Sequence, residues 1–254
     1  MIRIGPAGFG GSPVENIGHV AELGFTAAEV EFTYGVRMKK ADAEKLGELN
    51  KKHKLMLSIH APYYINLASK EKEKIEASKK RIIDSCERGH QMGAKYVVFH
   101  AGFYQGMDQE QVFQLIKKGI IEINETIKKN KWNIMLAPET TGKASQFGDL
   151  DELIRMKKET GCHICIDFAH LKARNIGKID YDEVMKKLKP LGYIHAHFSG
   201  IEWTDKGERR HLITEEKDIK ELLSYLLKYK IDATIINESP DPIGDCMKTM
   251  GILE

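Results

Sequence analysis

The sequence predicts one α/β domain, a (β/α)8 TIM barrel that occupies residues 1–254. Short apolar runs alternate with longer amphipathic stretches, which is typical of parallel strands joined by helices. Runs such as KYVVFHAG and ATIINESP are apolar almost throughout, as expected of strands covered on both faces. No linker rich in proline, glycine or serine divides the chain, and eight strand–helix units favour a closed barrel over an open sheet.

The expected elements follow one another in order. The strands are predicted at 2–5, 27–32, 55–60, 95–100, 133–138, 162–167, 193–198 and 233–238. Helices are predicted near 14–23, 40–53, 70–91, 108–129, 148–159, 180–189 and 214–229, with a short one at the C-terminus. The glycine-rich stretch GPAGFGG after the first strand lacks the GxGxxG spacing, so we interpret it as a loop and not as a dinucleotide-binding turn.

Composition says more about the cellular compartment of the protein than about its function. The formal net charge of +2 is too small to favour or exclude a nucleic-acid partner. Four scattered cysteines and the lack of a recognisable signal sequence lead us to expect a cytoplasmic protein. Cys162 and Cys165 are three apart on an expected strand and so point to opposite faces, which argues against one metal holding both. The apolar runs are too short for a membrane span, and no protein partner is predicted.

Imidazoles and carboxylates stand where the strands end, and barrel enzymes build their active sites there. They are His60, His100, Glu139, Asp167, His197 and Glu238, with His170 just after the sixth strand. We expect His197 at the rim and His195 supporting it from one layer below. Imidazoles mixed with carboxylates suit zinc, manganese or iron, whereas calcium prefers oxygen alone. The sequence therefore predicts a divalent-metal site at this rim. We interpret four other histidines as structural or surface residues: His19, His53, His90 and His163.

These segments resemble the endonuclease IV family of apurinic/apyrimidinic endonucleases, within the xylose isomerase-like barrels. SIHAPYYINLAS (58–69) carries the longest match, and GAKYVVFHAG (93–102) is similar to the segment of the family's second histidine. Shorter matches follow in the family's order: APETT, CIDFAHL, HAHFSG and NESPD. The resemblance spans nearly the whole chain.

The resemblance implies a centre of two or three zinc ions. His60 and His100 would hold one ion, which Glu139 bridges to a second held by Asp167, His197 and Glu238. His170 and His211 would hold a third. In the family, a metal-bound hydroxide cleaves the phosphodiester 5′ to an abasic site in double-stranded DNA. The resemblance also implies DNA contacts from three side chains. Tyr63 matches a family residue that helps to hold the bent DNA, and Tyr64 and Arg37 lie where loops would press into the duplex.

One segment departs from the family pattern. The family has an Asp two residues before the histidine of the third site, but GERRHLI places Arg209 there. Glu208, one residue earlier, substitutes for this carboxylate if the loop is shifted. Alternatively the Arg209 guanidinium replaces the third metal and clamps a substrate phosphate.

Two other functions fit the same residues. A single-metal sugar isomerase or epimerase of the same superfamily needs only Glu139, Asp167, His197 and Glu238, with the two glutamates moving protons. His60 and His100 have no ligand role in such a site, which favours the nuclease. A metal-containing barrel that binds nucleic acid without turnover is the third candidate.

Overall fold

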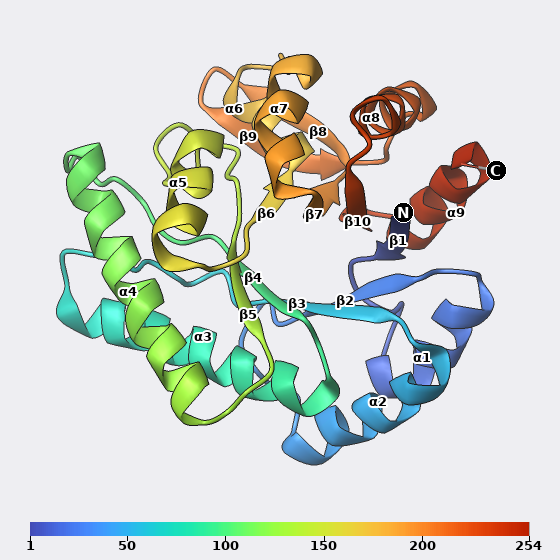
Figure 1. The fold of residues 1–254 in the computed structure, drawn as a ribbon, viewed down its shortest axis with the longest axis horizontal. Helices are drawn as coiled ribbons and strands as arrows, with labels where there is room; N and C mark the ends of the chain where they lie inside the picture. The colour runs from blue at the N-terminus through green and yellow to red at the C-terminus, as the bar shows by residue number, and fades with distance from the viewer. Residues whose placement is uncertain (254) are drawn as a thin grey trace.

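The computed structural model describes residues 1–253, whose parallel strands close into a barrel surrounded by helices (Figure 1). The strands pair in the orders β1-β10-β7-β6 and β2-β3-β4-β5. Parallel bridges between Ala7 and Glu29 and between Glu139 and Cys165 join these two sheets and complete the ring. The predicted (β/α)8 fold is confirmed.

The bounds of the elements lie within a few residues of most of those expected. The barrel strands are β1 (Ile2–Pro6), β2 (Ala27–Glu31), β3 (Met56–His60), β4 (Tyr96–Phe99), β5 (Met135–Pro138), β6 (Cys165–Asp167), β7 (Tyr193–Phe198) and β10 (Asp232–Asn237). The helices are α1 (Pro13–Glu22), α2 (Lys40–His53), α3 (Lys72–Met92), α4 (Gln109–Lys129), α5 (Leu150–Thr160), α6 (Phe168–Arg174), α7 (Tyr181–Leu188), α8 (Glu216–Tyr229) and α9 (Pro242–Leu253), with a 3-10 turn at Lys189–Leu191.

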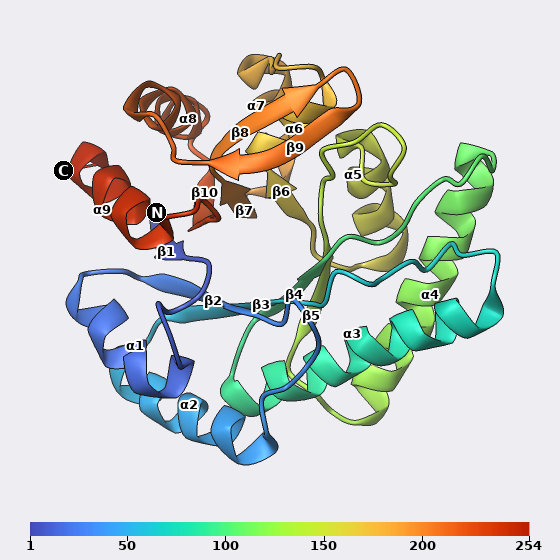
Figure 2. The same cartoon turned by 180° about the vertical axis from the view of Figure 1, so that it is seen from behind.

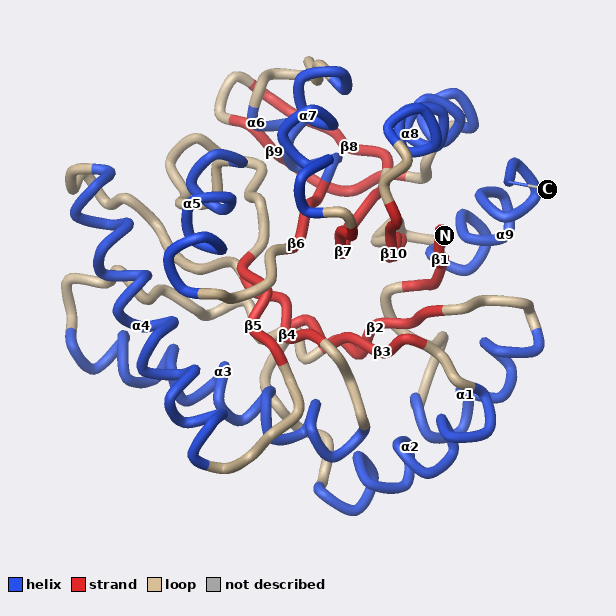
Figure 3. The backbone as a smooth tube through the Cα atoms, in the orientation of Figure 1, coloured by secondary structure: helices blue, strands red, loops and turns tan. Residues whose placement is uncertain are grey.

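The helices cover the outer face of the barrel (Figure 3), and the main hydrophobic core lies between them and the strands. Local sequence sets where several helices begin: the Asp108 carboxylate caps α4, and Asp149 with Glu152 forms a capping box at α5. Gly5 lets β1 approach β2, because a Cβ there would lie 1.8 Å from the Ala27 carbonyl oxygen. The barrel closes at this contact.

Alternate residues of each strand point into the barrel. At the amino-terminal end of the strands, the interior holds the rings of Tyr96 and Tyr193, with centroids 6.4 Å apart. The His163 ring packs against Tyr96 in a tilted arrangement, with centroids 4.4 Å apart. Further along, Cys165 and His195 face inward. The interior thus changes from aromatic and apolar to ionisable along the barrel axis.

Three features differ from the prediction. Helix α6 follows β6 directly, because the Asp167 carboxylate accepts a hydrogen bond from the His170 backbone and caps it. The antiparallel hairpin of β8 (Gly200–Thr204) and β9 (Gly207–Leu212) leaves the barrel after β7 and packs on α6 (Figure 2). Strand β6 is also shorter than expected, since it begins at Cys165 and not at 162.

All four cysteines are buried and free, in agreement with the interpretation of Cys162 and Cys165 as unpaired side chains. Among residues 1–253, no helix is both long enough and apolar enough to cross a membrane.

Candidate metal centre

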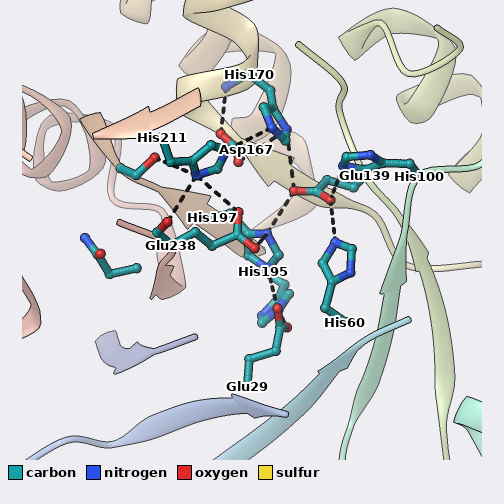
Figure 4. A network of polar contacts seen from close by, with 12 residues as sticks. Glu29, His60, His100, Glu139, Asp167, His170, His195, His197, His211 and Glu238 are labelled. Atoms are coloured by element: carbon teal, nitrogen blue, oxygen red, sulfur yellow. Dashed lines mark hydrogen bonds and ion pairs between the residues drawn. The ribbon is translucent and has the colours of Figure 1, made fainter. Parts of the chain in front are cut away.

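The carboxyl ends of the strands bring the predicted rim residues together (Figure 4), and several of them line a cavity of about 430 Å³: His60, His100, His170, His211 and Glu238. Six predicted side chains have ligand atoms that meet in two overlapping groups: His60, His100, Glu139, Asp167, His197 and Glu238. Within each group, one ligand atom per residue lies within 4.8 Å of the others. His170 and His211 join Asp167 in a third group.

Glu139 lies at the centre of this arrangement. Its Oε2 is 3.2 Å from His60 Nε2 and 2.9 Å from His100 Nε2. Its Oε1 is 2.8 Å from His197 Nδ1. The two oxygens of one buried carboxylate therefore face two different sets of donors, as a bridging ligand requires.

The second group contains Asp167 and Glu238 beside His197. Glu238 Oε1 lies 3.2 Å from His197 Nδ1. Asp167 Oδ2 is buried and lies 3.3 Å from His170 Nδ1, but it takes part in no hydrogen bond among the described residues. A buried carboxylate oxygen without a hydrogen-bond donor is costly, and a cation at this position would compensate it.

Backbone carbonyls orient three of the imidazoles in the same sense. The Nδ1 atoms of His60 and His170 lie 2.8 Å and 2.9 Å from the carbonyl oxygens of Ala61 and Thr140. His211 Nδ1 lies 3.2 Å from the Glu238 carbonyl oxygen. A neutral ring that donates Nδ1–H to a carbonyl keeps its lone pair on Nε2, and such contacts orient metal-binding histidines.

Glu208 supplies a carboxylate beside His170 and His211. Its Oε2 is 3.5 Å from His170 Nε2, and its Oε1 is 3.9 Å from His211 Nε2. Gly142 makes this position possible, because a Cβ on Gly142 would lie 2.5 Å from the Cβ of Glu208. The hairpin register also shifts between Glu202 and Trp203, opposite this segment.

Arg209 lies outside the cavity. Its side chain is exposed, and Nη1 contacts Glu202 at 2.7 Å. This position favours the alternative in which Glu208 substitutes for the family carboxylate over the one in which the Arg209 guanidinium replaces the third metal or clamps a phosphate there. Glu208 occupies that place because the hairpin register turns it inward and Arg209 outward.

The carboxylates also determine the charge of the buried rings. Burial disfavours protonated His60, but Glu139 and Glu31 outweigh it and raise the pKa of His60 to about 10. Burial also disfavours protonated His170, but Asp167 and Glu139 outweigh it and raise the pKa of His170 to about 9. Protons bound to the histidines thus compensate the negative charge of the buried carboxylates. Divalent cations bound to the same side chains can replace these protons. Neutral imidazoles with carboxylates form a donor set that fits zinc.

Two inward-facing glutamates were missed. Glu29 and Glu31 lie two residues apart on β2, and Glu31 pairs in register with His60 at the rim. Burial raises the pKa of Glu31 to about 8. The signal was present in the sequence, because alternation along the expected strand 27–32 places both on the face opposite Ala28 and Val30.

The predicted substrate residues lie around the mouth of the cavity. Tyr63 is exposed and lines it, and its ring lies 6.1 Å from that of His60. Tyr64 is also exposed. Arg37 lines a neighbouring hollow of about 620 Å³, which shares Glu31 with the cavity.

Comparisons with known proteins place this arrangement in a family. The family model described as xylose isomerase-like TIM barrel matches residues 17–252. The chain belongs to this family. An uncharacterized protein of Methanocaldococcus jannaschii is 39% identical over 231 residues, which cover 86% of this chain and 84% of that protein.

Proteins of both enzyme classes considered above are similar to this chain, the endonucleases in sequence and fold and the epimerases in fold. A probable endonuclease 4 of Carboxydothermus hydrogenoformans is 32% identical over 143 residues, which cover 54% of this chain and 47% of that protein. Endonuclease IV of Thermus thermophilus superposes with a TM-score of 0.76 at 20% identity, covering 99% and 98% of the two chains. A D-tagatose 3-epimerase-like protein superposes with a TM-score of 0.72 at 22% identity, covering 99% and 95%. The chain is thus a divergent relative of endonuclease IV, on a fold that sugar epimerases share.

Proposed function

We propose that this protein is a metal-dependent phosphodiesterase that cleaves DNA 5′ to abasic sites. The proposed centre holds up to three divalent ions, with zinc as the preferred metal. His60, His100 and Glu139 would hold the first, and Glu139, Asp167, His197 and Glu238 the second. His170, His211 and Glu208 would hold the third.

The observation that carries the proposal is the position of Glu208. A third ion needs an anionic donor beside His170 and His211, and the family's residue for this purpose is replaced by Arg209. Glu208 Oε2 lies 3.5 Å from His170 Nε2, so a carboxylate is present although its position in the sequence has moved by one residue. A single-metal reaction gives this side chain no ligand role.

The chemistry follows from the donor set. When bound, divalent ions lower the pKa of water and offset the charge on phosphoryl oxygens. The protein's own residues orient these ions, and the exposed aromatic side chains Tyr34, Tyr63 and Tyr64 offer surfaces on which bases can stack. Arg37 adds a cation beside the cavity that can contact a phosphate.

The test is incubation of zinc-loaded protein with a duplex containing one abasic site, beside an intact duplex. We expect scission 5′ to the abasic site only, and loss of scission in His60→Ala. His90→Ala is the matched control, since His90 lies exposed on α3 away from the cavity. Scission that His60→Ala leaves unchanged would contradict the assignment of the site.

The alternative is a single-metal sugar isomerase or epimerase. The group of Glu139, Asp167, His197 and Glu238 favours it, because this set alone suffices to hold one ion with a glutamate on either side. Conversion of a ketose to its epimer by the purified protein, retained in His60→Ala, would favour this reaction over the nuclease.

A further inference from the structure

Glu29 lies one layer below the rim, in a place where the proposed ligand set gives it no role. It belongs to β2 and is fully buried between that strand and β7, on the opposite side of the barrel interior from Glu139 (Figure 4). A carboxylate removed from water at this depth is costly unless specific partners compensate it. Its contacts therefore indicate what it does.

Both oxygens of Glu29 face histidines of β7. Oε1 is 3.0 Å from His197 Nε2, a close contact between two atoms that have no hydrogen-bond partner among the described residues. Oε2 is 3.4 Å from His195 Nε2, with which it shares a hydrogen bond. The opposite nitrogen of His197, Nδ1, faces the rim at 2.8 Å from Glu139 and 3.2 Å from Glu238. His197 therefore lies between a carboxylate below and the proposed second metal site above.

His197 is oriented in the reverse sense from the other imidazoles. His60, His170 and His211 place Nδ1 beside backbone carbonyls and direct Nε2 to the cavity. His197 directs Nδ1 to the cavity, and a carboxylate replaces the carbonyl at its other nitrogen. Both nitrogens of His197 face carboxylates, and a neutral imidazole carries one proton. With a cation at the rim bound to Nδ1, that proton lies on Nε2 beside Glu29.

We propose that Glu29 is a positioning residue that holds the Nε2–H of His197 and so presents Nδ1 to the second metal site. This inference rests on the metal centre of the proposed function but not on its substrate. An anionic partner also makes the ring a stronger donor than a carbonyl partner does. We expected His195 to support His197 directly. Instead it contacts the other oxygen of Glu29, so any support from His195 reaches His197 through that carboxylate.

A buried metal site offers a different explanation for the same residues. Cys165, His195 and His197 also place one ligand atom each within 4.8 Å of the others. The contact at 3.0 Å argues for the positioning role, because Glu29 already faces Nε2 of His197. The experiment below separates the two explanations.

The test compares Glu29→Gln and Glu29→Leu with wild type by titration of metal-free protein with zinc against a chromophoric chelator. Loss of a supporting contact lowers metal affinity by about 10–100-fold, so we expect one ion to weaken by that amount in Glu29→Leu. Glu29→Gln keeps an oxygen that can accept Nε2–H, and we expect a smaller loss. Wild-type affinity in Glu29→Leu would overturn the proposal.

Two further measurements separate positioning from general effects. Val30→Ala alters a buried neighbour on the same strand and keeps both carboxylates of β2; an equal loss there would overturn a specific role for Glu29. Nitrogen-15 NMR of the His197 ring in the zinc-loaded protein should show the Nε2–H tautomer in wild type and Glu29→Gln. The opposite tautomer in wild type would contradict the proposal.

His195→Asn provides the control for the buried metal site. We expect it to retain the wild-type number of ions, whereas loss of one whole ion would favour binding by Cys165, His195 and His197. These readouts do not depend on DNA cleavage. If abasic DNA is not cut but Glu29→Leu weakens one ion, the proposed function fails and the role of Glu29 stands.

Discussion

Histidines at the two ends of the barrel have opposite charge preferences. At the amino-terminal end, the His163 ring packs against Tyr96, and burial lowers the pKa of His163 to about 3. At the carboxyl-terminal end, burial also opposes protonation of His60, but Glu139 and Glu31 raise its pKa to about 10. The same side chain in the same barrel is thus neutral where its neighbours are aromatic and cationic where they are carboxylates.

This difference in pKa distinguishes a histidine buried for packing from histidines buried in a candidate metal site. At the aromatic end, a neutral ring needs only one hydrogen bond, which His163 Nδ1 makes with the Ile164 carbonyl at 2.8 Å. At the rim, several carboxylates are buried together, an arrangement that is costly unless cations compensate it. Only the second environment has the charge to hold divalent metal.

The largest expected effect is that of removing the central carboxylate. Glu139→Ala deletes the side chain whose oxygens contact His60, His100 and His197. Loss of a mere supporting contact costs metal sites about 10–100-fold, so we expect abasic-site scission to fall by at least about 100-fold. Single-turnover cleavage measures this, and a fall of less than about 10-fold would contradict the bridging role.

A smaller effect is expected from Gly142→Ala. The added Cβ would clash with Glu208, 2.5 Å from its Cβ, and push that carboxylate out of the cavity. We expect one ion per chain to be lost while the other two remain. Gly251→Ala is the matched control, because a Cβ there meets no atom within 4 Å. Unchanged metal content in Gly142→Ala would exclude Glu208 as a ligand.

The rim should also give the chelated protein an unusual dependence on pH. His60 and His170 have folded pKa values of about 10 and about 9, above the ordinary 6.5. Their stabilisation is full below pH 6.5 and is lost as pH rises through 9 and 10, because the folded state binds more protons there. Urea unfolding midpoints should fall over this range. Saturating zinc should reverse the trend, since metal and protons compete for these rings.

The smallest effect belongs to the aromatic end, where a single group titrates. His163 is neutral in the folded protein down to a pKa of about 3, whereas its unfolded pKa is about 6.5. Its stabilisation is full above pH 6.5 and is lost as pH falls toward 3. His163→Phe should flatten the acid limb of the unfolding midpoint, and metal affinity should not change. An unaltered acid limb would contradict the assignment.

Most of the rim could be predicted because a barrel imposes simple rules. Strand ends converge at one face and alternate residues share a side, which is enough to bring His60, Glu139 and Glu238 together. The same rule extends to Glu29 and Glu31, which share one face of the expected strand 27–32 but were not among the predicted ligands.

The third site could not be predicted by such rules. The direction of Glu208 depends on a register shift in a hairpin that has no counterpart among the barrel strands. It also depends on the missing Cβ of Gly142, a residue distant in sequence. Helix α6, which carries His170, is too short for its periodicity to stand out, and only its cap at Asp167 marks it.

Counting the metal ions on the purified protein tests the central claim most directly. We expect elemental analysis of wild-type protein, prepared without chelator, to return about three divalent ions per chain, including zinc. Glu208→Ala should return about two. A single ion in the wild type would favour the epimerase reaction, and none would contradict the metal centre altogether.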